Sequence, residues 1–515
     1  MQNEMTFERG KAFTALTMNT LAFTVCFAVW TMYGVLITFL VDNKVFAFDK
    51  AQMGWLIGIP ILTGSIFRLP VGVLTDRFGG RPVYTAVLLI SAVSAYLTSF
   101  ANDFWGFAIG GLGFGFAGTG FAVGIAYTSV WFPRNLQGTA LGIFGAGNAG
   151  AAVTSLGAPT LLGVLTDGGA NLDAWRTLPK VYAGSLVLMA IAFWLLTTSK
   201  RVEHGHELSL RERLQPLKVM RVWRFGLYYF LVFGGFVAMA SWLIPYYVNV
   251  YTTTVAMAGF LTSIFSLPSG LIRALGGYLS DRFGARSIMY WVLGGTGLCC
   301  LLLVVPRMDV YAPGEGVMAG APGVVESVSP TAVVAGGKTY VLRAKPDEPY
   351  RDEGVLVWPA GSFWQEPAVK VGDKVVKKQL VGRGVTHIFF QANIWIFTFL
   401  VFLVGILMGI GKAAVYKHIP EYFPTQVGVV GGIVGVIGGL GGFFCPIAFG
   451  YMLKASGIWT TCWMFFAILS AVCLVWMHFV IRRMMKERAP NLAQQIESPH
   501  NRLVAISEVR QAVAR

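Results

Sequence analysis

The sequence predicts an all-α polytopic membrane protein made of two six-helix bundles, with a small β-rich domain inserted into the second bundle. Three observations support this. Of the 515 residues, 55% are hydrophobic and only 13% are charged, which is more apolar residue than one soluble core of this length needs. A stretch at 64–81 occurs again in changed form at 269–286. A polar segment at 307–390 interrupts the apolar runs of the second half.

Apolar runs long enough to cross a bilayer define twelve predicted spans. They lie at about 14–41, 52–75, 82–100, 104–131, 138–165, 181–198, 225–249, 257–279, 287–306, 391–416, 427–453 and 456–481. The first run is too long for a signal-peptide core, so we expect a retained helix. The predicted parts are an N-terminal bundle (1–198), a cytoplasmic linker (199–224), helices 7–9 (225–306), the insert (307–390), helices 10–12 (391–481) and a cytoplasmic tail (482–515).

The basic residues of the short loops gather on one side of these spans. We expect a multi-pass protein of the cell (inner) membrane. The positive-inside rule then places both termini in the cytoplasm and the 307–390 insert on the extracytoplasmic side. The net charge of +15 follows from the same bias, so we expect the lipid bilayer but no nucleic acid as a partner. A monomer is expected, and the sequence does not indicate what the insert binds.

Cysteine and histidine spacing indicates neither a disulfide framework nor a metal site. The six cysteines all fall in apolar spans, where a buried thiol packs like a small apolar group. His204 and His206 could bind a metal, but no further ligand lies nearby in the sequence, so a solvated loop is favoured. No cofactor is expected. Because no nucleophile–base pair or phosphate loop is present, we do not expect an enzyme.

The repeated stretch reads GSIFRLPVGVLTDRFGGR in the first half and SGLIRALGGYLSDRFGAR in the second. Each copy places an arginine, Arg68 or Arg273, eight residues before an Asp-Arg-Phe-Gly turn. At about 1.5 Å per residue, each arginine lies roughly 12 Å from the turn and near the centre of the bilayer. The predicted turn residues are Asp76, Arg77, Gly79, Asp281, Arg282 and Gly284.

No aspartate or glutamate falls deep inside a predicted span, so neither arginine has a predicted carboxylate partner in the membrane. An arginine at a helix centre costs about 2.5 to 3.5 kcal/mol on insertion scales, and such residues are expected to face a cavity or a ligand. A substrate anion would supply the missing partner, because a guanidinium suits planar oxyanions. The alternative is that both arginines are structural and bind backbone carbonyls or tyrosine hydroxyls.

Other polar residues in the spans suggest parts of an anion path. Asn148 is a lone amide in a Gly- and Ala-rich span and needs a partner. Lys412 is predicted about one turn from the cytoplasmic end of the tenth span, where it could either snorkel to the interface or belong to the anion path. His418 is near it and could carry a proton.

The insert contains strand-like runs separated by turn signals such as Gly336-Gly337. Its end, VKVGDKVVKKQLVGRG, resembles the Gly-Asp turn of biotinyl- and lipoyl-type domains. No lysine stands in the context that those carriers modify, so we expect a structural or interaction module.

The two Asp-Arg-Phe-Gly turns resemble the loop signature of the major facilitator superfamily, which implies a twelve-helix major facilitator fold with a site between the bundles. The arginine pair, together with GTGFAVGIAYTSVWFP, GIFGAGNAGAA and VVGGIVGVIGGLGGFF, resembles the nitrate/nitrite porter family of that superfamily. In that family, paired arginines hold the anion, aromatic residues flank it, and an asparagine and glycines complete the site. The resemblance implies the substrate-binding residues Arg68, Phe121, Gly145, Asn148, Tyr229, Phe233, Arg273 and Gly438.

These observations predict alternating-access transport of nitrate, nitrite or both. Spans without carboxylates favour nitrate/nitrite exchange, whereas Lys412 and His418 keep proton symport open. Two alternatives stay open as well: a porter for small carboxylates such as formate or oxalate, and an anion sensor that does not transport.

Overall fold

The computed structural model describes residues 8–200, 214–305, 308–346, 360–423 and 427–488. His204 and His206 lie outside the described residues. In the described part, eleven helices are long and apolar enough to cross a membrane, or twelve if the bent pair Val255–Leu271 and Arg273–Phe283 is one span. This agrees with the predicted polytopic α-helical protein. Most contacts between residues fall within one of two compact units, a helical bundle and a strand-rich unit around residues 303–400.

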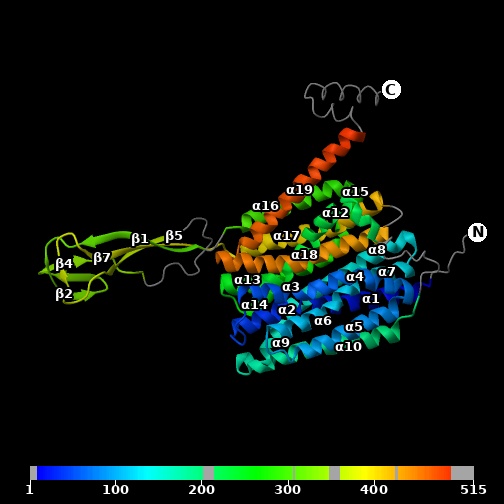
Figure 1. Cartoon of the computed structure of the whole chain (residues 1–515), viewed down its shortest axis with the longest axis horizontal. Coiled ribbons are helices and arrows are strands. Elements are labelled where there is room, and N and C mark those ends of the chain that lie inside the picture. The colour runs from blue at the N-terminus through cyan, green and yellow to red at the C-terminus, as the bar shows by residue number, and fades with distance from the viewer. Residues whose placement is uncertain (1–7, 201–213, 306–307, 347–359, 424–426, 489–515) are drawn as a thin grey trace, which may run out of the picture. The chain divides into compact units, whose positions relative to one another are not determined.

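Four of the six spans of the first half are broken, whereas those formed by α5 and α10 are continuous (Figure 1). Short 3-10 turns η1 (Gly115–Thr119) and η2 (Ala146–Ala149) interrupt two spans at glycine-rich segments, where no side chain resists a change of backbone geometry. The α-helices are α1 (Arg9–Trp30), α2 (Met32–Asp42), α3 (Lys50–Ile66), α4 (Arg68–Phe78), α5 (Gly80–Thr98), α6 (Phe104–Phe114), α7 (Gly120–Trp131), α8 (Arg134–Gly145), α9 (Gly150–Leu165) and α10 (Thr177–Leu196).

The second half repeats this plan with a different break. A π-helical turn, η6 (Phe230–Gly234), joins two helices of the seventh span, and the eighth span bends by 47° between its two helices. The α-helices are α12 (Met220–Tyr229), α13 (Gly235–Tyr251), α14 (Val255–Leu271), α15 (Arg273–Phe283), α16 (Ala285–Leu303), α17 (Ile394–Tyr422), α18 (Val427–Ser456) and α19 (Thr461–Arg488). The last helix and α17 extend beyond the predicted ends at 481 and 416.

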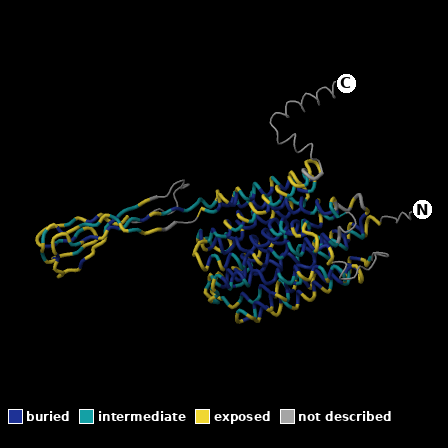
Figure 2. The backbone as a smooth tube through the Cα atoms, turned by 45° about the horizontal axis from the view of Figure 1, so that its top comes forward, coloured by how far each residue is buried: buried dark blue, intermediate teal, exposed yellow. Residues whose placement is uncertain are grey.

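Buried side chains gather inside the helical unit, and exposed apolar ones such as Leu195, Trp291 and Phe479 lie on its outside (Figure 2). This is the distribution expected of helices whose outer surface contacts lipid rather than water. We call the end of the bundle where α3 begins and α18 ends the Asp49 end. The opposite end, where α12 and α16 begin and α17 ends, is the Arg224 end.

The strand-rich unit holds two antiparallel sheets with strand orders β1-β7-β5 and β4-β3-β2-β6. Gly336 and Gly337 both have positive φ and form the tight turn between β3 and β4. A small apolar core includes Val325, Val333 and Val381. The strands are β1 (Met308–Met318), β2 (Gly323–Ser329), β3 (Ala332–Ala335), β4 (Lys338–Val341), β5 (Ala360–Pro367), β6 (Lys374–Val375) and β7 (Leu380–Phe390). The extracytoplasmic location of this unit and its lipoyl-like fold stay predictions.

Candidate functional site

Arg68 is the first residue of α4, directly after the break in the second span, and only 3% of it is exposed. Its Nη1 donates to the carbonyl oxygen of Gly435 on α18 at 2.8 Å, and its Nε donates to that of Gly118 on η1 at 3.3 Å. The Nη2 atom is buried and has no hydrogen-bond partner. Arg68 therefore joins the two halves while one of its donors stays free for a ligand.

Arg273 occupies the matching place at the start of α15, after the 47° bend. It is half-buried, and its Nη1 is inaccessible to solvent without a hydrogen-bond partner. The guanidinium carbons of Arg68 and Arg273 lie 5.2 and 5.5 Å from the centre of the Phe121 ring. The two side chains thus converge from opposite halves on one aromatic ring, and their positive charges repel each other.

Two more aromatic rings extend this cluster into the second half. Phe121 stacks on Phe233 at 6.2 Å, and Phe233 stacks on Tyr229 at 4.9 Å with ring planes only 7° apart. Phe233 lies within the π-turn η6, a type of helix irregularity that is frequent at functional sites. Gly438 on α18 lets Tyr229 approach, since an added Cβ would be 2.1 Å from the tyrosine ring. The hydroxyl of Tyr229 lies within electrostatic range of both guanidiniums.

Asn148 lies in the 3-10 turn η2, fully buried, and neither of its amide atoms has a hydrogen-bond partner. Burying an unpaired amide costs free energy, roughly 1 to 3 kcal/mol per unsatisfied group in protein mutational data. Gly145 ends the preceding helix, where an added Cβ would be 3.2 Å from Cδ of Arg273. Gly145 therefore lies against the second arginine, and the unsatisfied amide of Asn148 follows it three residues later.

Among the described residues, neither Arg68 nor Arg273 forms an ion pair with a carboxylate. The alternative hypothesis, that both arginines are structural, holds in part, because Arg68 does bind backbone carbonyls of both halves. It leaves Arg68 Nη2, Arg273 Nη1 and both Asn148 amide atoms without partners in a buried cluster. We call Arg68, Arg273, Phe121, Asn148, Tyr229 and Phe233 the arginine cluster.

Two aromatic residues that sequence reasoning did not select also contact the arginines. The Trp30 ring lies 5.5 Å from the guanidinium carbon of Arg68, and the Tyr416 ring lies 5.7 Å from that of Arg273. Tyr416 also packs edge-on against Tyr229 and donates to the carbonyl oxygen of Gly431. In the sequence, both are single aromatic residues in apolar runs, a pattern that does not distinguish a ligand site from core packing.

Comparison with known families matches this chain to the model of the Major Facilitator Superfamily over residues 20–333 and 380–513. A protein of Thermus thermophilus named "Probable nitrate/nitrite antiporter NarK1" is 38% identical over 494 residues, which cover 95% of this chain and 96% of that protein. The chain belongs to the nitrate/nitrite porter family of the major facilitator superfamily. A protein of Bacillus subtilis named "Nitrite extrusion protein" is 26% identical and covers 93% of this chain and 98% of its own length.

Solved structures of other transporters share the fold of this porter family member. A bacterial homologue of the lysosomal transporter Spinster, in an inward-facing and occupied conformation, matches with a TM-score of 0.60 at 15% identity and covers 93% of this chain and 99% of its own. The nucleoside transporter NupG matches with a TM-score of 0.57 at 12% identity, covering 90% of this chain and 99% of its own. At these identities the likeness shows the fold alone.

Lys412 corrects one prediction made from the sequence. It was expected about one turn from the end of its span, but α17 continues to Tyr422 and the side chain is fully buried. Its Nζ lies 3.2 Å from the centre of the Phe236 ring and donates to the carbonyl oxygen of Ser269 at 3.3 Å. Snorkelling to the interface is therefore wrong. The ammonium instead lies within electrostatic range of Arg273.

His418 is in a different environment from the arginine cluster, at the Arg224 end of α17. Its ring stacks on Phe225 at 5.5 Å with planes 9° apart, and its Nδ1 lies 3.8 Å from Oε2 of Glu421. Its role in coupling stays a prediction.

The loop motifs act as helix ends in the structure. Gly79 and Gly284 both have positive φ at the ends of α4 and α15, which explains glycine there. Asp281 forms an ion pair of 2.5 Å with Lys417 of α17. Asp76 and Arg77 are exposed at the first turn, and Arg282 donates to the Tyr278 hydroxyl at the second.

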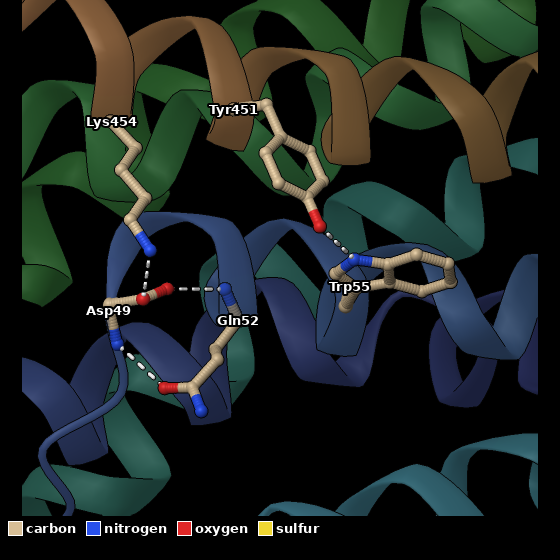
Figure 3. Close-up of polar contacts among 5 residues, drawn as sticks. All are labelled: Asp49, Gln52, Trp55, Tyr451 and Lys454. Atoms are coloured by element: carbon tan, nitrogen blue, oxygen red, sulfur yellow. Dashed lines mark hydrogen bonds and ion pairs between the residues drawn. The ribbon is translucent and has the colours of Figure 1, made fainter.

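At the Asp49 end, polar contacts join the two halves directly (Figure 3). Asp49 caps α3 by accepting from the Gln52 amide, and its other oxygen accepts from Lys454 of α18 at 2.8 Å. Trp55 donates to the Tyr451 hydroxyl at 3.3 Å. Along the same seam an added Cβ at Gly54 would be 2.4 Å from the Pro446 carbonyl oxygen, so the backbones touch. We call the Asp49–Lys454 contact the latch.

Proposed function

We propose that this protein exchanges nitrate and nitrite across the cell membrane by alternating access, with the anion held between Arg68 and Arg273. The observation that carries the proposal is the convergence of two guanidiniums on Phe121 with buried donors left unsatisfied and no carboxylate paired with either among the described residues. The names of the two relatives above, a nitrate/nitrite antiporter and a nitrite extrusion protein, support the choice of substrate.

The chemistry of a small oxyanion fits these donors. A guanidinium presents planar N–H groups that pair with planar oxyanions, and a bound anion would offset the repulsion between the two arginines. The Asn148 amide would add a donor, and the faces of Phe121 and Phe233 would confine a planar ligand. Since one arginine comes from each half, anion binding would draw the two halves together.

The latch supports a direction for the state described. Positive-inside orientation assigns the Arg224 end to the cytoplasm and the Asp49 end to the outside. With the latch and the α3–α18 seam in place, the protein would be closed to the outside. Opening to the outside would break the latch and separate the backbones at Gly54.

Exchange is favoured over proton symport because an incoming counter-anion can replace the departing one between the arginines. Lys412 supports the competing mechanism, since its buried ammonium is held by little more than the Phe236 ring and one carbonyl oxygen. A small carboxylate would also suit the arginine pair, which makes formate and oxalate the substrates to compare.

Counterflow in proteoliposomes tests the proposal. Vesicles loaded with nitrite and diluted into labelled nitrate should accumulate the label, and vesicles without internal anion should not. Uptake driven by a pH gradient without internal nitrite would contradict pure exchange. Stronger competition by formate or oxalate than by nitrite would favour the carboxylate porter, and saturable nitrate binding without flux would favour the sensor.

A further inference from the structure

A second basic cluster lies at the Arg224 end, entirely within the second half and apart from the arginine cluster. It surrounds a cavity of about 20 Å³. One side of the cavity is formed by Arg224, Tyr228, Arg286, His418 and Tyr422, and the other side by apolar residues of α19 such as Met477 and Ile481. No residue of the first half lines it, so it does not lie on the path between the halves that the proposed transport uses.

Several arginine side chains gather around this cavity. Arg224 is only 8% exposed, Arg286 donates to the Tyr422 hydroxyl, and the guanidinium carbon of Arg221 lies 4.6 Å from the Tyr422 ring. These three arginines are close enough to repel one another. In the described part of the chain, none of them forms an ion pair with a carboxylate. Among the described residues, Glu421 is an acidic residue beside the cavity, and its ion pair is with His418, at 3.8 Å.

Buried polar atoms facing this cavity also lack partners. The Tyr228 hydroxyl is on a side chain only 1% exposed and has no hydrogen-bond partner, and the same holds for Nδ1 of His418, 3% exposed. Unsatisfied buried groups beside several unpaired guanidiniums are what an anion site shows without its ligand. The Tyr228 hydroxyl and the planar N–H groups of Arg224 could donate hydrogen bonds to the two non-bridging oxygens of a phosphodiester.

The position of the cavity identifies the source of the anion. Met477 and Ile481 of α19 line the cavity, and the other face of α19 carries exposed apolar side chains such as Val475 and Phe479, which suit contact with acyl chains. The cavity lies at the ends of α12, α16, α17 and α19, which is headgroup depth for helices that cross a bilayer. Basic pockets between helices on the cytoplasmic side are places where anionic lipid headgroups bind. A cavity of this size holds about one water-sized group, so it would accept a free oxygen of a phosphate at its mouth and leave the glycerol and chains outside.

We propose that Arg224, Arg286 and Tyr228 form a binding site for the phosphate of an anionic phospholipid, separate from the transport site. Arg224 and Tyr228 contact the phosphate from the buried side, and Arg286 from the exposed side. The net positive charge of the cluster selects phosphatidylglycerol or a related acidic lipid over a zwitterionic one. The bound phosphate joins the ends of α12 and α16.

The test uses the full-length protein purified in detergent. Dioleoylphosphatidylglycerol, dioleoylphosphatidylcholine and inorganic phosphate are titrated separately, with retained lipid measured by native mass spectrometry and stability by thermal unfolding. We expect phosphatidylglycerol to bind at least tenfold more tightly than phosphatidylcholine and to raise Tm by several degrees. Arg224→Gln should weaken phosphatidylglycerol binding about tenfold, and the exposed variant Arg286→Gln less. Arg9→Gln, at the start of α1, is the matched control and should leave binding unchanged.

Three results would overturn the proposal. The first is equal binding of phosphatidylglycerol by the wild type and both cavity variants. The second is equal binding of phosphatidylcholine and phosphatidylglycerol. The third is inorganic phosphate that binds as tightly as phosphatidylglycerol and displaces it, which would make the site one for a free anion. If Arg224→Gln does not fold, Arg286→Gln and Tyr228→Phe carry the test alone, because Arg286 is exposed and Tyr228→Phe keeps the ring.

Discussion

The two halves carry the same repeated stretch, but their arginines are held differently. Arg68 is almost fully buried and donates to carbonyl oxygens of η1 and α18, whereas Arg273 is half-buried and its Nη1 has no partner. Arg68 is thus anchored by backbone carbonyl oxygens of both halves. Under the proposed function, Arg273 would depend more on a ligand. Equivalent positions in the two halves can therefore have different contacts and different roles, because the halves do not meet symmetrically.

The largest effect should come from replacing each arginine with lysine. A lysine at 68 has one nitrogen in place of the two that reach Gly118 and Gly435, so Arg68→Lys should lower exchange roughly 100-fold and also lower Tm. Arg273→Lys should lower exchange about tenfold with little change in Tm, because it breaks fewer protein contacts. Proteoliposome exchange and thermal unfolding measure the two effects. Equal losses of Tm would contradict the difference between the halves.

Asn148 and Asn19 allow a sharper comparison between a ligand amide and a structural amide. Both are buried, but Asn19 donates to the Gly124 carbonyl oxygen and the Thr128 hydroxyl, whereas Asn148 has no partner. Asn148→Ala should raise KM for nitrate about tenfold, as expected for one lost hydrogen bond to a charged ligand, with Tm unchanged. Asn19→Ala should lower Tm with KM unchanged. A lowered Tm with unchanged KM for Asn148→Ala, or a raised KM with unchanged Tm for Asn19→Ala, would contradict this assignment.

Glycine positions on α18 test whether Tyr229 must lie where the structure has it. An alanine Cβ at Gly438 would collide with the Tyr229 ring at 2.1 Å, whereas one at Gly432 meets nothing within 4 Å. Gly438→Ala should therefore lower exchange by about tenfold, in line with an overpacking cost of ~1 to 3 kcal/mol. Gly432→Ala is the matched control on the same helix and should exchange normally. Normal exchange by Gly438→Ala would show that the ring can move without loss.

The smallest expected effect concerns the latch. The hydrogen bond from Lys454 holds the pKa of Asp49 below its ordinary value, so the closed state gains from the ionised carboxylate. That gain is present at neutral pH and is lost as pH falls through the lowered pKa. An exposed pair contributes little to stability, so Asp49→Asn should shift the conformational balance only about twofold. Distance measurements between spin labels at the Asp49 end, with and without the substitution, would detect this. These distances would be measured at neutral pH and at a pH below the lowered pKa of Asp49. If the distance distribution changes neither with pH nor with the substitution, the latch has no part in the mechanism.

Sequence reasoning reached the fold and the arginine pair because these depend on hydropathy, repetition and charge. It missed Trp30 and Tyr416, since an aromatic residue in an apolar span has the same pattern whether it packs in the core or beside a ligand. It placed Lys412 wrongly because hydropathy does not give the rotation of a helix about its axis or its true end. The pairing of Asp49 with Lys454 joins the start of α3 to the end of α18, 405 residues apart, which no local pattern predicts.

The most direct test of the account is nitrate counterflow by Arg68→Ala and Arg273→Ala in nitrite-loaded proteoliposomes, beside Lys11→Ala, an exposed lysine paired only with Glu8. The account predicts that both arginine variants lose counterflow by roughly 100-fold or more, while Lys11→Ala keeps it. Counterflow that persists in either arginine variant, at a protein level equal to that of the wild type, would contradict the claim that the anion is held between the two arginines.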